Sequence, residues 1–380
     1  MTVLHSSPEP LLNMGESSLN EDLIDDYDEE DEVISTTYSI TSYGADYPVD
    51  SIVKRMQQND IVVPTYCMDL EPNQQTIGFQ REFVWKKSQC DRFIESLLLG
   101  LPVPGIFLVK ESSGKLLVLD GQQRLRTLSG FVEGILQGKE YVLDHVQEKW
   151  KGKRYKTLEP EDRRRLDDSI IHATIVRQDE PAEDQSSIYL IFERLNSSGT
   201  VLQPQEIRVA LYHGEYASLL SRLNENTYWR ELYGRKSARL KDLELILRFF
   251  SLYYRASAYK KPMKEFLNKS MANNKNLTKY TGDELTTLFE NVVTLIHDSI
   301  GKRAFRLKNA VNAALVDSLM VGVASRLSSG PIENPILIEE HYRKLLHDQS
   351  YLKAVSSGTA DEDSVTMRLS LAKKVFAEVE

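Results

Sequence analysis

The sequence contains 380 residues, of which 41% are hydrophobic and 27% are charged, which is typical of a globular chain with room for two domains. No apolar run is long enough to span a membrane, and the first residues lack the basic and apolar regions of a signal peptide. We therefore expect a cytoplasmic protein without membrane contact. Only Cys67 and Cys90 are present, which excludes a disulfide framework and a cysteine-rich zinc site.

The net charge of −9 originates at one end of the chain. Residues 1–32 contain eleven acids and no Lys or Arg, which leaves 45 acids against 47 bases in the remainder. So charged a segment cannot bury a core, and we predict that residues 1–50 form a disordered acidic arm. Such an arm either keeps the chain in solution or mimics nucleic acid and covers a basic groove.

A folded region is predicted to start near Ser51, with a short helix and a strand. Apolar residues at helical spacing from Cys90 to Leu98 predict a second helix, which Gly100 ends. Two β-rich runs on either side of the turn cluster "KESSGK" predict a hairpin of buried strands. Helical spacing resumes after Gly121, so the second strand leads directly into a helix.

The turn between that strand and that helix, "DGQQR" at residues 120–124, combines features of a phosphate site. A helix N-terminus presents unpaired N–H groups, and glycine lets an anion approach the backbone. Arg124 adds a planar donor fork, while Gln122 and Gln123 carry no charge that would repel phosphate. Asp120 is unfavourable there unless a metal ion, a sugar hydroxyl or an arginine accounts for it. Alternatively, Asp120 caps the helix, Arg124 pairs with a surface acid and the glutamines face solvent.

Three segments in this order resemble the N-terminal domain of GmrSD-type restriction proteins, a family catalogued as domain of unknown function 262. They are "FQREFVW" (79–85), "LVLDGQQRLRTL" (117–128) and "IFERLNSSGTVLQPQEIRVALY" (191–212). The family is similar to the ParB and sulfiredoxin superfamily, whose members bind a nucleotide at a Gly-x-x-Arg turn. The resemblance implies that this turn corresponds to residues 121–124 and that residues 80–81 face the same pocket.

The resulting candidate site has one acid and a set of nucleotide-binding positions. Asp120 is the predicted catalytic residue and the predicted ligand of Mg²⁺. The predicted nucleotide-binding residues are Gln80, Arg81, Gly121, Gln122, Gln123, Arg124, Thr127, Asn196 and Gly199. The turn that contains Asn196 and Gly199 has an alternative interpretation as an Asx-turn that only redirects the chain.

A basic segment lies between the second and third motifs. Lys151, Lys153, Arg154 and Lys156 are interleaved with aromatic residues, a pattern that suits contact with a nucleic-acid backbone. A solvated surface loop followed by a short helix is the alternative interpretation.

After Gln203 the pattern is helical almost to the end of the chain. We therefore predict an α+β fold class, with a small ParB/sulfiredoxin-like domain (51–200) followed by an all-α helical domain (201–380). The aromatic residues of "RFFSLYYR" are predicted to pack in the helical core.

These features predict a nucleoside triphosphate-binding and hydrolysing subunit of a DNA restriction or phage-defence system. Mg²⁺ would neutralise the triphosphate, and Asp120 would orient the metal or the attacking water. Many relatives are coupled to an HNH-type nuclease, but the seven histidines here are scattered, so a separate nuclease subunit and DNA are the expected partners. The alternative is a non-hydrolysing module whose nucleotide or DNA binding shifts a conformation that a partner protein detects.

Overall fold

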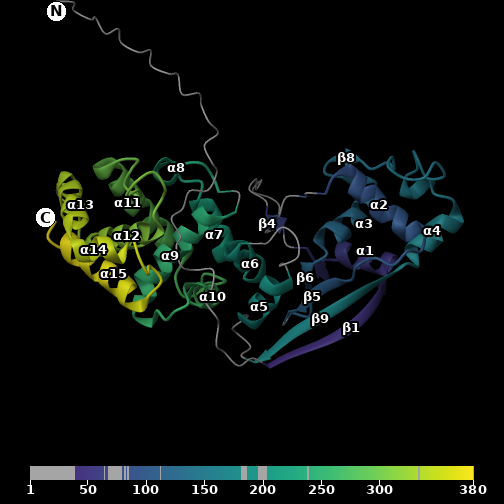
Figure 1. Cartoon of the computed structure of the whole chain (residues 1–380), viewed down its shortest axis with the longest axis horizontal. Coiled ribbons are helices and arrows are strands. Elements are labelled where there is room, and N and C mark those ends of the chain that lie inside the picture. The colour runs from purple at the N-terminus through teal and green to yellow at the C-terminus, as the bar shows by residue number, and fades with distance from the viewer. Residues whose placement is uncertain are drawn as a thin grey trace, which may run out of the picture.

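The computed structural model describes residues 39–63, 65–66, 79–80, 83, 85–111, 113–180, 186–195, 203–237, 239–332 and 334–379, without the side chains of 65–66, 79–80, 180 and 186. Within these residues, a mixed α+β region with a five-stranded sheet precedes an all-helical region (Figure 1). The predicted fold class, α+β followed by all-α, is confirmed. The likeness to the ParB and sulfiredoxin superfamily stays a prediction.

The sheet has the strand order β1-β9-β5-β6-β2. The hairpin predicted from sequence is the antiparallel pair β5–β6, β1 is antiparallel to β9, and β2–β6 and β5–β9 are parallel. The strands are β1 (Ser39–Pro48), β2 (Ile61–Val62), β5 (Ile106–Lys110), β6 (Leu116–Asp120) and β9 (Ile170–Glu180). Two short pairs lie apart from it: β3 (Thr65–Tyr66) with β4 (Phe79–Gln80), and β7 (Ile135–Leu136) with β8 (Lys139–Glu140).

The predicted disordered arm, residues 1–50, is wrong for its last twelve residues, because residues 39–48 form strand β1 and helix α1 starts at Val49. The strand exists because β9, far along the chain, accepts and donates its main-chain hydrogen bonds. Nothing in the local sequence shows that partner. The acidic residues 1–38 lie outside the described residues, so the arm itself stays a prediction.

Both faces of the hairpin β5–β6 are covered, because alternate side chains of a strand point to opposite faces. Leu116 and Val118 pack with the helices of the N-terminal region, whereas Leu117 and Leu119 pack with α5 and the helices that follow it. The N-terminal helices are α1 (Val49–Gln57), α2 (Lys87–Leu98), α3 (Gln122–Glu133), η1 (Tyr155–Thr157) and α4 (Pro160–Asp167).

After β9, every described element is a helix, as the sequence predicts. The helices are α5 (Ser186–Leu195), α6 (Pro204–Leu211), α7 (Glu215–Leu223), α8 (Thr227–Tyr233), α9 (Lys241–Arg255), η2 (Ala256–Ala258), α10 (Met263–Asn273), α11 (Gly282–Ile300), α12 (Ala313–Leu327), α13 (Ile336–His347), α14 (Gln349–Ala354) and α15 (Glu362–Phe376). Helix α5 precedes the predicted domain boundary at residue 200, yet its apolar face belongs to the same hydrophobic cluster as the later helices. The division at residue 200 therefore stays a prediction.

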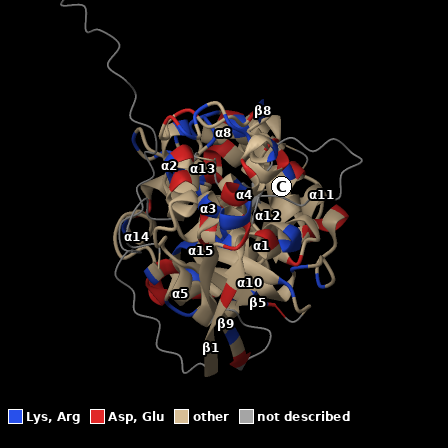
Figure 2. Ribbon diagram, turned by 90° about the vertical axis from the view of Figure 1, so that its right-hand side faces the viewer, with Lys and Arg blue, Asp and Glu red and all other residues tan. Residues whose placement is uncertain are grey.

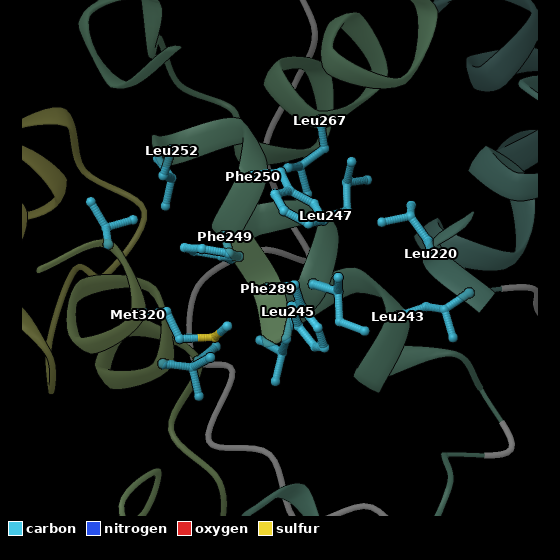
Figure 3. Close-up of a cluster of buried hydrophobic side chains, with 14 of the residues drawn as sticks. Leu220, Leu243, Leu245, Leu247, Phe249, Phe250, Leu252, Leu267, Phe289 and Met320 are labelled. Atoms are coloured by element: carbon cyan, nitrogen blue, oxygen red, sulfur yellow. The ribbon is translucent and has the colours of Figure 1, made fainter. Parts of the chain in front are cut away.

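Helix α9 passes through the middle of the helical region. Its Leu245, Leu247, Phe249 and Phe250 lie among side chains from α7, α10, α11 and α12 (Figure 3). Phe249 and Phe250 are buried, as predicted for the aromatic cluster, whereas the two tyrosines that follow on α9 are partly buried.

A buried cluster of charges joins α9, α12 and α15. Asp317 accepts hydrogen bonds from Arg248 Nε at 3.1 Å and Nη2 at 2.9 Å, and from Arg368 Nη2 at 2.9 Å. All three side chains are almost completely buried. Burial alone would raise the pKa of Asp317, but the two guanidinium groups outweigh that effect and hold the pKa below its usual value.

Asp317→Asn should lower the free energy of unfolding at neutral pH by about 3–5 kcal/mol, because it leaves two guanidinium groups buried without a balancing charge. The folded-state pKa of Asp317 is depressed, so its contribution is present above its unfolded pKa of about 3.9 and is lost as the pH falls through the folded value. Urea unfolding of both proteins between pH 7 and pH 2 should show the difference shrinking only in the acid range. Asp363→Asn, an exposed change on α15, is the matched control, and a loss no larger than in that control would contradict the assignment.

Candidate functional site

The turn at residues 120–121 lies where β6 ends and α3 begins. Gly121 is the N-cap residue of α3 with φ of +98°, and no side chain caps the helix. A Cβ atom at Gly121 would lie 2.4 Å from Ile106 Cγ2. A glycine is therefore required at this position for two reasons: the backbone is left-handed, and β5 lies too close for a side chain. The uncapped first turn of α3 has the form of an anion site.

The guanidinium of Arg124 forms hydrogen bonds within the protein. Its Nη1 donates to the carbonyl oxygens of Pro104 and Gly105, both at 2.6 Å, and its Nη2 donates to Asp120 Oδ2 at 2.7 Å. The side chain is only 13% exposed, and it joins the start of β5 to the end of β6 and the first turn of α3. We name these contacts of Arg124 with Pro104, Gly105 and Asp120 the arginine clasp.

Asp120 does not cap α3, since the N-cap position is occupied by Gly121, which makes no side-chain cap hydrogen bond. A metal ion, a sugar hydroxyl or an arginine would each account for an acid at this position. The structure shows the arginine, because Arg124 binds Asp120. The Asp120 side chain is nevertheless 44% exposed, so its carboxylate remains open to a ligand from solvent.

The first and second sequence motifs meet at α3. Gln123 Oε1 accepts a hydrogen bond from the backbone N–H of Trp85 at 3.3 Å, and Gln137 Nε2, just beyond α3, donates to the carbonyl of Phe83 at 3.1 Å. Gln122 Oε1 is buried and accepts no hydrogen bond in the described part of the chain. The end of "FQREFVW" therefore lies against α3, next to the 120–124 turn.

Thr127 lies behind the turn rather than on its surface. It is fully buried, and its Oγ1 donates to the carbonyl of Gln123 at 2.7 Å. It also contacts Cys90 on α2, where burial raises the pKa of the thiol and a hydrogen bond with Thr127 partly offsets the increase. Thr127 thus supports α3 from the core, and its contact with nucleotide stays a prediction.

The remaining predicted positions are incompletely placed. Gln80 is in β4, opposite Thr65 of β3, and its side chain is not described. Arg81, Asn196 and Gly199 lie outside the described residues. The third motif begins in helix α5 and continues in α6, which starts at Pro204 as its composition predicts.

Sequence reasoning missed the two carbonyl partners of Arg124. The carbonyl oxygens of Pro104 and Gly105 accept hydrogen bonds from its guanidinium. A Cβ atom at Gly105 would lie 2.8 Å from the carbonyl oxygen of His172 on β9, so a side chain at this position would crowd the strand. The only local signal is the segment "PVPG" before β5, whose prolines and glycine predict a turn. It does not show which side chain its carbonyls will bind.

The predicted nucleic-acid strip is largely ion-paired. Lys151 lies 3.5 Å from Glu148, Lys153 lies 3.3 Å from Glu159, and Arg154 lies 2.8 Å from Glu140, while Lys156 is exposed. Acidic and basic segments alternate around α4 (Figure 2). These exposed pairs are weak and can exchange partners, so contact with a nucleic-acid backbone stays a prediction.

Within the described ranges, no group of three or more His, Cys, Asp or Glu side chains forms a metal site. Also within those ranges, no helix is long and apolar enough to cross a membrane.

Gly121→Ala should lower the free energy of unfolding by about 2–4 kcal/mol, because it combines a disfavoured backbone angle with overpacking against Ile106. Gly134→Ala at the other end of α3 is the matched control, with φ of +85° but nothing within 4 Å of its Cβ position. This control should lower the free energy of unfolding by only about 1 kcal/mol, because it has the disfavoured backbone angle without the overpacking. Equal losses in urea unfolding would show that the contact with Ile106 is unimportant.

Arg124→Ala should lower the free energy of unfolding by about 1.5–3 kcal/mol, because it removes charge-assisted hydrogen bonds to two carbonyl groups. The ion pair with Asp120, whose side chain is 44% exposed, adds less. Arg92→Ala, an exposed change on α2, should stay within about 0.5 kcal/mol. Thermal and urea unfolding of both variants test this difference, and indistinguishable losses would contradict the arginine clasp.

A comparison with known families matches residues 21–213 to the family described as "GmrSD restriction endonuclease, N-terminal domain". The match includes all three sequence motifs and the whole sheet. No curated protein and no solved structure matches the chain.

Proposed function

The chain belongs to the GmrSD restriction endonuclease N-terminal domain family and so has a role in a restriction system, and we propose that within it the chain binds a nucleoside triphosphate at the 120–124 turn. One observation carries the proposal: the uncapped start of α3 has a glycine with φ of +98° and lies beside a half-exposed carboxylate. Backbone N–H groups of a first helical turn suit phosphate oxygens.

The arginine clasp changes the role expected of Arg124. With donors bound to two carbonyls and to Asp120, the guanidinium stabilises the turn that presents the N–H groups. Phosphate binding is therefore assigned to the backbone of Gly121 and Gln122, supported by the side-chain amide of Gln122. The charge of Arg124 is balanced by Asp120, so its role in this proposal is to hold the turn in place.

Mg²⁺ fits Asp120 as a site with a single protein carboxylate. The ion prefers hard oxygen ligands and usually combines one or two carboxylates with phosphate oxygens and water. Bound there, it would neutralise charge on the triphosphate. Asp120 would hold the ion or accept a proton from the attacking water, since its carboxylate is open to solvent.

A second candidate is a non-hydrolysing module, and the ion pair between Asp120 and Arg124 favours it. That pair gives the acid a structural purpose without a metal ion. Nucleotide binding would then act by changing the α3 turn, and a partner protein or DNA would respond to the change. A separate nuclease chain is a proposed partner in either case.

Asp120→Asn separates the two candidates. If Asp120 is catalytic, hydrolysis should fall by about a hundredfold or more, whereas nucleotide affinity should change much less. Phosphate release from all four nucleoside triphosphates, with and without DNA, measures the first quantity, and calorimetry measures the second. Unfolding of the variant should stay close to wild type, because the Asp120 side chain is half exposed and the amide oxygen of asparagine can still accept the hydrogen bond from Arg124.

Asp168→Asn, an exposed change after α4, is the control and should hydrolyse normally. A variant at Asp120 with unchanged turnover would contradict its catalytic role. Wild-type binding without any turnover would support the non-hydrolysing module, and the absence of any nucleotide binding would contradict both candidates.

A further inference from the structure

The outer edge of strand β1 has no partner within the described residues. β1 is ten residues long and ends the strand order of the sheet, with β9 on its inner side only (Figure 1). Residues 39–44 are exposed, including Ile40 and Tyr43, which are 42% and 44% exposed. β9 pairs with β5 only as far as Val176, so the far end of the β1–β9 pair extends past the other strands.

The hydrogen-bond pattern shows which residues of β1 point outward. The N–H of Val49 donates to the carbonyl of Ser169 at 3.0 Å, directly after the aligned residues Pro48 and Ile170. Bonded and non-bonded pairs alternate along an antiparallel ladder. The outward set therefore contains Ser42, Gly44, Asp46 and Pro48, and Pro48 fits it because proline has no N–H to donate.

The middle of this edge, Ile40 to Ala45, lacks the features that usually block strand pairing. Residues 39–45 contain no charge and no proline, whereas natural edge strands commonly have lysine, proline or a bulge. The one charged residue of the strand, Asp46, is bound by His172 Nδ1 at 2.5 Å. The two ends of the strand are protected, by Pro48 at one end and by a register shift between Ser39 and Ile40 at the other.

We propose that a second copy of this chain pairs with β1 in antiparallel orientation, with the two-fold axis at Gly44. Identical antiparallel strands related by a two-fold axis are self-complementary, so each copy provides what the other needs. In this register Gly44 faces Gly44 of the second copy, and Tyr43 faces Ala45. The pairing extends the five-stranded sheet of each copy into one continuous sheet.

The distribution of charge selects this orientation and register. Ser42 faces Asp46 of the second copy, so a hydroxyl donor meets a carboxylate and no like charges oppose each other. A register centred on Asp46 would place two carboxylates opposite each other. Antiparallel pairing also places the two copies of Ser39, where each strand begins, at opposite ends of the strand pair.

Sedimentation velocity of the full chain over a range of concentrations tests the proposal. Wild type should form a dimer, and Ser42→Pro should weaken it by about tenfold or more, since it removes an outward N–H without removing a bond to β9. Ser42→Ala, which keeps the N–H, should dimerise like wild type. Circular dichroism and thermal unfolding check that the fold is retained.

Cysteine cross-linking tests the register and does not depend on the proline variant folding. Nothing lies within 4 Å of the Cβ position of Gly44, so Gly44→Cys fits the single chain. At the two-fold axis the paired Cα atoms would be about 5.5 Å apart, within disulfide range. Ser42→Cys is the matched control, because its two copies would be separated by about 14 Å along the strand.

Oxidation should give a disulfide-linked dimer for Gly44→Cys and no more than the wild-type background, from Cys67 and Cys90, for Ser42→Cys. A wild type that stays monomeric at all concentrations would overturn the proposal. So would a dimer that Ser42→Pro leaves intact, or cross-linking that is equal at the two positions.

Discussion

The hairpin of β5 and β6 is shared by two hydrophobic cores, and the rest of the fold depends on this arrangement. Leu116 and Val118 belong to the core under α1, α2 and α3, while Leu117 and Leu119 belong to the core of the helical region. A shift of β6 by one residue would move each set into the wrong core. The register of β6 is therefore fixed from both sides, and so is the position of the turn that follows it.

The arginine clasp links the candidate site to the fixed strands of the hairpin. Arg124 binds two carbonyls at the start of β5 and a carboxylate at the end of β6, while it belongs to the first turn of α3 itself. Because its charge is already balanced by Asp120, the turn offers a ligand mainly backbone N–H groups and an exposed carboxylate oxygen. Such a turn is held rigid before any ligand arrives, which reduces the entropic cost of binding.

The two cores are stabilised in different ways. Around the turn, small contacts decide the geometry, such as the approach of Ile106 to Gly121. In the helical region, α9 is surrounded by apolar side chains and is joined to α12 and α15 through Asp317, which two arginines bind. Buried charges of this kind restrict how helices can slide past one another, because any displacement breaks several bonds at once. Helix α5 packs against the back of β6, so the helical region directly supports the strand that ends at the site.

The sequence by itself determined the hairpin and most helices of this protein and the position of the candidate turn. Apolar periodicity located the β5–β6 hairpin, α2 and α3, and the glycine at residue 121 located the turn, because these signals depend on neighbouring residues. Tertiary structure alone decided that residues 39–48 are a strand, that Thr127 is buried against Cys90, and that Arg124 binds carbonyls 19 and 20 residues earlier in the chain. A local pattern specifies which groups a side chain offers, but the partner of each group is fixed only when distant segments pack together.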